Sequence, residues 1–319
     1  MTRLDAALAE GLQVQLGRAL VLRPPVGMDL SALGDAHVVA TFKPAYDHFA
    51  AMGRSVSVRP EGRYAVALVC ITRAKEESRG LIADAAAHAP LVLVDGSKTD
   101  GIESLLKEVK RRLAVDWVTS KAHGKLFAFQ AGDFSDWRAV PRQVDGFTTA
   151  PGVFSADAID PASHLLVEAL PKKLSGTVAD LGAGWGYLSH RILARPEVAA
   201  VHLVEADHTA LSCAKLNVTD PRAVFHWADA TRIEVPTPVD AVVMNPPFHQ
   251  GRAAEPALGQ AFIASAARLL KPNGKLWCVA NRHLPYEQEA ARLFQTVSEV
   301  AGDRRFKVLL AEKPRRRAR

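Results

Sequence analysis

Residues 177–187 have the sequence TVADLGAGWGY, and this stretch decides the fold class. Its first five residues suit a buried strand, and a helical pattern begins at its last residue and continues to Ala194. Between them stand Gly182, Gly184 and Gly186, where the missing Cβ lets the backbone approach a ligand closely. A glycine-rich turn from strand to helix is typical of α/β sheets, which bind ligands at the carboxyl ends of their strands.

The same alternation of strand and helix patterns extends through the second half of the chain. The expected strands are 177–181, 201–204, 223–226, 241–244 and 275–280, and the expected helices are 161–169, 187–194, 209–217 and 258–270. A turn is expected at 271–274, where the sequence is KPNG. These lengths and connections predict a doubly wound sheet with helices on both faces.

The first half shows a similar style. Residues 64–71 form a continuous apolar run, as in a strand buried on both faces. A helix pattern follows at 74–88, a strand pattern at 91–94 and a charged amphipathic helix pattern at 101–113. This order implies a second parallel α/β sheet. Glycine, proline and polar residues between 131 and 151 indicate a linker, so we predict one domain over residues 1–144 and another over 145–319.

Composition excludes several protein classes. The chain has 319 residues, of which 48% are hydrophobic and 23% charged, so wholesale disorder is excluded. The longest apolar stretch, 65–71, is far shorter than the roughly 18 residues that a membrane span needs. The N-terminal residues include an acid at Asp5 and lack the apolar segment of a signal peptide, so a signal peptide is not expected. Three scattered cysteines offer neither a disulfide framework nor zinc spacing, so we expect a cytoplasmic protein without a metal.

The positive charge is concentrated at one end. The net charge is +6, and the last seven residues contribute +5 of it. Such a tail can neutralise nucleic-acid phosphates, or it can simply be a solvated end that aids solubility. Charge alone therefore leaves the partner open.

The glycine loop narrows the choice of cofactor. A nicotinamide or flavin fingerprint would need glycine at position 187, where this chain has Tyr187. A loop without room for pyrophosphate and led by an acid, Asp180, suits a cofactor with a positively charged amino-acid end, such as S-adenosylmethionine. A purely structural turn is the competing interpretation of these glycines.

Two further acids follow successive strands. Glu205 ends the strand at 201–204 and could accept both hydrogen bonds of a ribose diol. Asp229 follows the next strand and could accept from an adenine amino group. Taken singly, each has a structural alternative, as a helix cap for Glu205 and as a turn residue for Asp229. Three acids at three strand ends favour a nucleoside-like ligand.

The strongest signal is the loop NPPF at 245–248, directly after the strand at 241–244. Asn245 offers an amide oxygen, Pro246 a backbone carbonyl and Phe248 an aromatic face, and the prolines restrict the loop. Two acceptors could hold both hydrogens of a planar NH2 group while the ring stacks on its base. An amine conjugated to a base is a poor nucleophile, so this help with orientation and polarisation would matter. We expect Pro247 to face the substrate and Asn245 to line the cofactor pocket as well.

The second half resembles the class I methyltransferases, and more narrowly the bacterial 16S ribosomal RNA guanine-N2 methyltransferases. The segments that carry the resemblance are PGVFS at 151–155, the glycine loop, NPPFHQG at 245–251, VANRHLPY at 279–286 and RFK at 305–307. The resemblance spans about residues 151–309. It implies two tandem Rossmann-like methyltransferase domains, of which the first is degenerate and supplies substrate recognition or structural support.

The resemblance also implies further site residues. Phe154 and Ser155 would line the cofactor pocket beside Asp180, Glu205, Asp229 and the three glycines. Arg282, Arg305 and Lys307 would contact RNA phosphates, although a solvated surface role is equally open. Trp185 departs from the small residues usual in this loop and could narrow the methionine end of the pocket.

The resulting expectation is an S-adenosylmethionine-dependent enzyme that methylates guanine N2 in small-subunit ribosomal RNA. Its partner would be ribosomal RNA or the small ribosomal subunit. The protein would be a monomer and would not associate with a membrane. Methylation of adenine N6 or of a protein glutamine remains an alternative, because the NPP-aromatic loop suits all three amines. A non-catalytic RNA-binding or ribosome assembly factor is the rival from another class. An NAD-dependent oxidoreductase is weakened by Tyr187.

Overall fold

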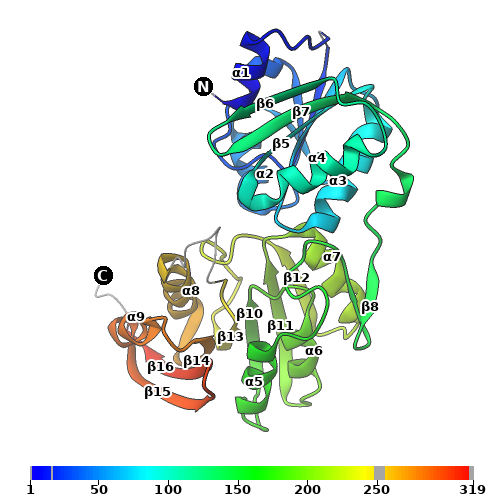
Figure 1. Cartoon of the computed structure of the whole chain (residues 1–319). Helices are drawn as coiled ribbons and strands as arrows, with labels where there is room; N and C mark the ends of the chain where they lie inside the picture. The colour runs from blue at the N-terminus through cyan, green and yellow to red at the C-terminus, as the bar shows by residue number, and fades with distance from the viewer. Residues whose placement is uncertain (1, 16, 248–255, 316–319) are drawn as a thin grey trace. The chain divides into compact units, whose positions relative to one another are not determined.

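The computed structural model describes residues 2–15, 17–247 and 256–315. The chain divides into two compact units, Met1–Pro141 with Ala150–Gly152, and Arg142–Thr149 with Val153–Arg319. Figure 1 shows one mainly in blue to green and the other in green to red. The domain boundary predicted after residue 144 falls within a hairpin of β8 (Arg142–Val144) and β9 (Phe147–Thr149).

The first unit is a seven-stranded sheet in the order β3-β2-β1-β4-β5-β7-β6. Its elements are α1 (Arg3–Ala9), β1 (Ala19–Leu22), β2 (Ala36–Val39), α2 (Lys43–Ala51), β3 (Ser55–Ser57), β4 (Val66–Cys70), α3 (Lys75–His88), β5 (Leu91–Ser97), α4 (Ile102–Lys110), β6 (Trp117–Lys121) and β7 (Gly124–Gln130). Alternate residues of its central strands enter two different cores, one with α3 and α4 and the other with α1 and α2. The strands are therefore buried on both faces, as their continuous apolar runs predict.

The second unit repeats this topology in the order β12-β11-β10-β13-β14-β16-β15. Its elements after the hairpin are α5 (Pro161–Ala169), β10 (Gly176–Leu181), α6 (Tyr187–Leu193), β11 (Val198–Glu205), α7 (His208–Asn217), β12 (Ala223–Trp227), β13 (Val239–Met244), α8 (Pro256–Leu269), β14 (Leu270–Asn281), α9 (Tyr286–Leu293), β15 (Phe294–Gly302) and β16 (Phe306–Pro314). One face of the sheet packs on α8 and α9 through a continuous apolar core.

The prediction of parallel sheets needs one correction. Five adjacent strands of each sheet are parallel to one another, but β7 and β16 run antiparallel to the strands on both of their sides. The cause is local, because β6 and β7 are joined by a two-residue turn at Ala122 and His123, both with positive φ. A short hairpin connection requires antiparallel strands.

Equal strand order lets the two units be compared position by position. Leu22 at the end of β1 lies opposite Val39 and Val69, as Leu181 at the end of β10 lies opposite Val204 and Met244. The residues that follow are therefore equivalent in pairs, namely Arg23 with Gly182, Ala40 with Glu205, and Cys70 with Asn245. The carboxyl edge of the second sheet carries the predicted site residues, and that of the first sheet carries different ones.

Candidate active site

The three loop glycines serve different purposes. All have positive φ, at 76° for Gly182, 56° for Gly184 and 92° for Gly186. A Cβ on Gly186 would approach the Val218 side chain to 2.9 Å, so glycine there permits close helix packing. A Cβ on Gly184 would meet no heavy atom of the described residues within 4 Å. Gly184 thus faces open space where a ligand can approach the backbone.

Glu205 is tied to this loop. Its Oε2 accepts a hydrogen bond from the Gly184 N–H at 2.8 Å, and its Oε1 accepts from the Asp207 N–H at 2.7 Å. Burial raises the pKa of the Glu205 carboxyl, while these backbone N–H groups oppose the rise. Each oxygen keeps a second lone pair, so the carboxylate can still accept from a ribose hydroxyl.

Asp180 is completely buried, with no exposed surface. Its Oδ2 accepts a hydrogen bond from the Ser189 hydroxyl at 2.7 Å, and its Oδ1 has no hydrogen-bond partner among the residues that the structure describes. Burial raises the pKa of Asp180 to about 7, and the neighbouring Glu205 charge adds to the rise. An orphaned buried acceptor next to an open glycine suits a cationic ligand group nearby, because such a charge would stabilise the ionised carboxylate.

Asp229 has the geometry of a turn residue. Its Oδ1 accepts from both the backbone N–H and the hydroxyl of Thr231, at 2.8 and 2.7 Å. The pocket described below does not include it among its lining residues. The structural alternative raised for Asp229 therefore has direct geometric support, and its contact with an adenine amine stays a prediction.

Asn245 follows β13 and lies against the start of α5. Its Nδ2 donates to Asp160 Oδ2 and to Ser163 Oγ, each at 2.9 Å. Asp160 is also the N-cap of α5, where it accepts from the Ser163 N–H at 2.7 Å. Pro246 and Pro247 continue the loop, and the predicted stacking residue Phe248 lies outside the described residues.

A pocket brings many of these groups together. Its lining residues are Phe154, Ser155, Asp160, Ser163, Gly182, Ala183, Gly184, Trp185, Tyr187, Leu188 and Asn245. It unites the glycine loop, the segment before α5 and the residue after β13. The sequence therefore identified five of its members, at positions 154, 155, 182, 184 and 245, whereas Asp180, Gly186 and Glu205 are not among the lining residues.

Trp185 lines the pocket and also connects the glycine loop to neighbouring segments. Its side chain is only 4% exposed, packs against Phe147 and donates from Nε1 to the Phe154 carbonyl at 3.0 Å. Asn217 at the end of α7 adds to this link, because its Nδ2 donates to the carbonyls of Thr148 and Trp185, both at 2.8 Å. Together they fasten the segment carrying Phe154, whose own side chain is exposed, to the glycine loop.

Sequence reasoning missed Asp160, Ser163 and Asn217 as contributors to this site. The signal for Asp160 was the pair Asp-Pro at the start of a helix pattern, which indicates an N-cap but not a partner 85 residues away. Asn217 gave no signal beyond the end of a helix.

The three basic residues predicted to contact RNA occupy different environments. Lys307 is only 4% exposed, and its ammonium donates to the carbonyls of Arg282 and Leu284 and pairs with Glu287 at 2.6 Å. This geometry does not fit the phosphate contact predicted for Lys307, because the charge is already satisfied inside the protein. The Arg282 guanidinium donates to Glu299 and to a backbone carbonyl, whereas the exposed Arg305 stacks on its neighbour Phe306.

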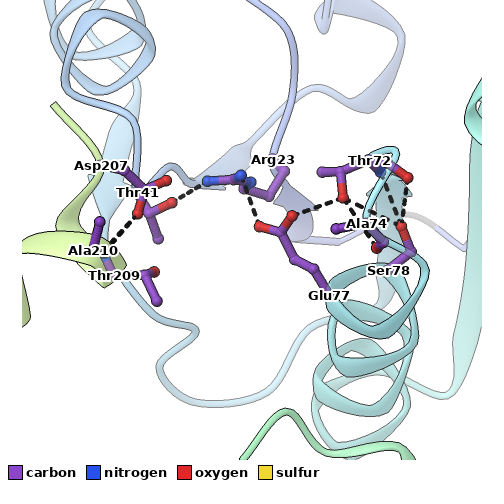
Figure 2. Close-up of polar contacts among 9 residues, drawn as sticks. All are labelled: Arg23, Thr41, Thr72, Ala74, Glu77, Ser78, Asp207, Thr209 and Ala210. Carbon is purple, nitrogen blue, oxygen red and sulfur yellow. Dashed lines mark hydrogen bonds and ion pairs between the residues drawn. The ribbon is translucent and has the colours of Figure 1, made fainter. Parts of the chain in front are cut away.

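The equivalent edge of the first unit is filled by side chains. Arg23 has φ 56°, close to that of Gly182, and its guanidinium pairs with Glu77 at 2.7 Å and donates to the Thr41 hydroxyl. Glu77 in turn accepts from the Thr72 hydroxyl at 2.7 Å (Figure 2). A residue with positive φ thus follows β1 as one follows β10, but here it carries a large paired side chain where the other sheet has glycine.

Two absences hold for the part of the chain that the structure describes. No group of three or more His, Cys, Asp or Glu side chains is arranged to hold a metal ion there. Within the same residues, no helix combines the length and apolar character needed to cross a bilayer.

Comparison with known proteins agrees with this geometry. Residues 145–310 match the family model described as the methyltransferase small domain. The chain is 32% identical over 246 residues to "Ribosomal RNA small subunit methyltransferase C" of Hahella chejuensis, covering 72% of this chain and 70% of that protein. It is 35% identical over 167 residues to "Ribosomal RNA large subunit methyltransferase G" of Shewanella oneidensis, covering 50% of this chain and 44% of that one.

A solved structure matches nearly the whole chain. It is the T. thermophilus 16S rRNA N2 G1207 methyltransferase (RsmC) in complex with AdoMet and guanosine. The TM-score is 0.81 at 26% identity, with 97% of this chain and 91% of that chain covered. The match therefore includes both units and not only the second.

Proposed function

The chain belongs to the bacterial 16S ribosomal RNA guanine-N2 methyltransferase family, within the methyltransferase small domain proteins, and we propose from this that it methylates the exocyclic N2 amine of a guanine in small-subunit ribosomal RNA. Its methyl donor is S-adenosylmethionine, the ligand named for its structural relative. The relatives named for the small subunit align over more of the chain than those named for the large subunit, which supports the choice of RNA.

The observation that carries the proposal is the fixed amide of Asn245. Its nitrogen is engaged by Asp160 and Ser163, so its oxygen is left as the acceptor for a substrate amine. The Pro246 carbonyl would be the second acceptor, and together they would align both N–H bonds of the guanine amine. We assign the stacking of the base to Phe248 and a substrate contact to Pro247.

The pocket residues and the acids at the neighbouring strand ends fit S-adenosylmethionine. When bound, it would supply an electrophilic methyl group on a sulfonium centre. Gly184 leaves space for the ligand, the ionised Asp180 would favour its ammonium group, and Glu205 would accept from its ribose hydroxyls. Gly182 and Gly186 shape the loop, and Phe154, Ser155 and Asn245 would close the pocket. Asp229 is assigned to the adenine end.

The substrate chemistry places one demand on the enzyme. The guanine must be unpaired or flipped, because a pocket cannot reach an amine inside a base stack. The methylated amine can then lose its proton to water, so no general base is assigned. We propose that Arg282 and Arg305 contact phosphates, and that residues 1–144 support substrate binding or the structure of the catalytic domain.

The direct test is incubation of the chain with tritiated S-adenosylmethionine and unmodified small ribosomal subunits or their RNA. The expected product is N2-methylguanosine in the 16S RNA. Label in N6-methyladenosine or in protein would instead support the alternative amines. Binding to ribosomal RNA without methyl transfer would support an assembly factor and would overturn the proposal.

The proposal also covers the cellular location and the oligomeric state of the protein. Ribosomal RNA in bacteria is cytoplasmic, so we place the protein in the cytoplasm and expect it to act as a monomer without a metal. Light scattering of the purified chain would test whether it is a monomer. Methylation assays with and without a chelator would test whether the reaction needs a metal.

A further inference from the structure

The Asn245 amide touches two groups that the reaction itself does not require. Its Nδ2 donates to Asp160 Oδ2 and Ser163 Oγ at 2.9 Å each. Both partners stand in the first turn of α5 or at its cap, 85 and 82 residues earlier in the chain. Both N–H bonds of the Asn245 amide, on which the proposed chemistry depends, are therefore accepted by groups at the start of α5.

The identity of the partner decides which way the amide points. Rotation by 180° about the last side-chain bond would exchange the amide oxygen and nitrogen of Asn245. An ionised carboxylate can only accept hydrogen bonds, so Asp160 accepts only from the nitrogen. The rotated amide would set its oxygen against the Asp160 carboxylate and would present NH2 to a substrate amine, which needs an acceptor.

The cap of α5 holds Asp160 itself in place. The same Oδ2 that meets Asn245 accepts the Ser163 N–H at 2.7 Å, and Pro161 at the first helical position restricts the backbone next to it. Ser163 is 7% exposed, so its hydroxyl is packed rather than free to turn into solvent. The two acceptors are thus fixed before any substrate arrives.

We propose that Asp160 and Ser163 are positioning residues that lock the Asn245 amide with its oxygen toward the substrate amine. This inference rests on the proposed function. It adds a cause for the orientation of the acceptor, and it assigns the α5 cap a role in the rate of methyl transfer in addition to its role in helix stability.

Three substitutions separate these two roles. Ser163→Ala removes one acceptor and leaves the Asp160 cap intact. Asp160→Ser retains an N-capping oxygen but shortens the side chain, so it loses reach to Asn245. Asp160→Asn keeps an oxygen for both the cap and Asn245. Asp220→Ser is the matched control, because Asp220 also accepts a backbone N–H in a turn. It precedes the amino end of β12, whereas the site lies at the carboxyl ends of the strands.

The expected results are graded single-turnover rates with little change in affinity for S-adenosylmethionine. Ser163→Ala should slow methyl transfer about three- to tenfold and Asp160→Ser about tenfold, from the usual size of one hydrogen bond. Asp160→Asn should remain within about threefold of the unmodified enzyme, and Asp220→Ser should match it.

A double-mutant cycle supplies the decisive measurement. If both residues act through Asn245, then Ser163→Ala and Asp160→Ser should cause no further loss when Asn245 is already alanine. An equal loss in both backgrounds, or a loss that falls on cofactor affinity, would overturn the proposal. Ser163→Ala carries the test even if Asp160→Ser fails to fold. Absence of methyl transfer by the unmodified enzyme would instead refute the proposed function.

Discussion

Asn245 is the residue on which the proposed reaction depends most. Replacement by alanine removes the acceptor oxygen but none of the groups expected to hold S-adenosylmethionine at its loop. Asn245→Ala should therefore lower the single-turnover rate on the order of 10²–10³-fold, about 3–4 kcal/mol, as for loss of one preorganised contact. Asn245→Asp retains an acceptor oxygen but sets its second oxygen against the Asp160 carboxylate, so it should keep only partial activity. Calorimetry should find cofactor affinity nearly unchanged, and methyl transfer at the full rate by the alanine variant would refute this role.

Gly184 gives a test of where the cofactor binds. Gly184→Val places a branched side chain in open space beside the pocket and should abolish S-adenosylmethionine binding in calorimetry. Gly53→Val is a suitable control, because Gly53 also has positive φ and open space but lies in the first unit. The control should share the backbone strain and keep cofactor binding. Equal affinities in the two variants would place the pocket elsewhere.

Asp180 links the site to the pH dependence of stability. The pKa of Asp180 is about 7 in the folded protein, above the ordinary 3.8. Ionisation of this carboxyl therefore does not lower the free energy of unfolding below pH 4, where the group is protonated in both states, and lowers it fully above pH 7. The free energy of unfolding without cofactor should therefore fall as pH rises from 4 to 7. Asp180→Asn should be more stable than the unmodified chain at pH 8, by about 4 kcal/mol at most.

Denaturant titrations at pH 4 and pH 8 would measure this difference. The gain should shrink toward pH 4, where Asp180 is protonated in both folded and unfolded chains. The same variant should bind S-adenosylmethionine more weakly, because the ligand loses an anionic neighbour. A stability gain of equal size at both pH values would show that ionisation is not its cause.

At the scale of elements, the glycine loop depends on the segment before α5. Trp185 and Asn217 hold that segment by hydrogen bonds to Phe154 and Thr148. Trp185→Phe keeps an aromatic ring against Phe147 but loses the donor to the Phe154 carbonyl. We expect S-adenosylmethionine affinity to fall about three- to tenfold, the usual size of one hydrogen bond.

Trp117→Phe provides the comparison for this prediction. Trp117 also donates from its ring nitrogen, to Thr119 at 2.8 Å, but it belongs to the first unit. Its loss should leave cofactor affinity unchanged in the same titration. If Trp185→Phe binds the cofactor as tightly as this control, the link to Phe154 does not shape the pocket.

The sequence predicted the first helices and strands of the second unit well, because these have clear local patterns. The turn expected at 271–274 was wrong, since these residues belong to β14, and α9, β15 and β16 were not predicted. The helix expected at 161–169 has those bounds in α5, and the strand expected at 177–181 differs from β10 by one residue. Pairing across the chain was not accessible in this way. Nothing local to Lys307 indicates that two carbonyls and Glu287 enclose its ammonium, and nothing local to Asp160 indicates Asn245 as a partner.

At the scale of the whole molecule, two sheets of one topology carry one complete set of site residues. In the first unit the positions equivalent to Gly182, Glu205 and Asn245 are Arg23, Ala40 and Cys70. An ion-paired guanidinium and a missing carboxylate disfavour a nucleoside ligand there. We therefore expect one S-adenosylmethionine per chain in calorimetry or equilibrium dialysis, and a stoichiometry of two would contradict this prediction.

The shared strand order also bears on how the chain reaches its native state. Two sheets with equal order and direction offer each strand a wrong neighbour in the other half, and such misassembly is a characteristic failure of chains with repeated domains. The strands differ in composition at matching places: β1 is ALVL, whereas β10 is GTVADL and carries a buried acid. Inserting β10 into the first sheet would bury Asp180 without Ser189. Divergence between the two halves should therefore disfavour the exchange of these strands during refolding.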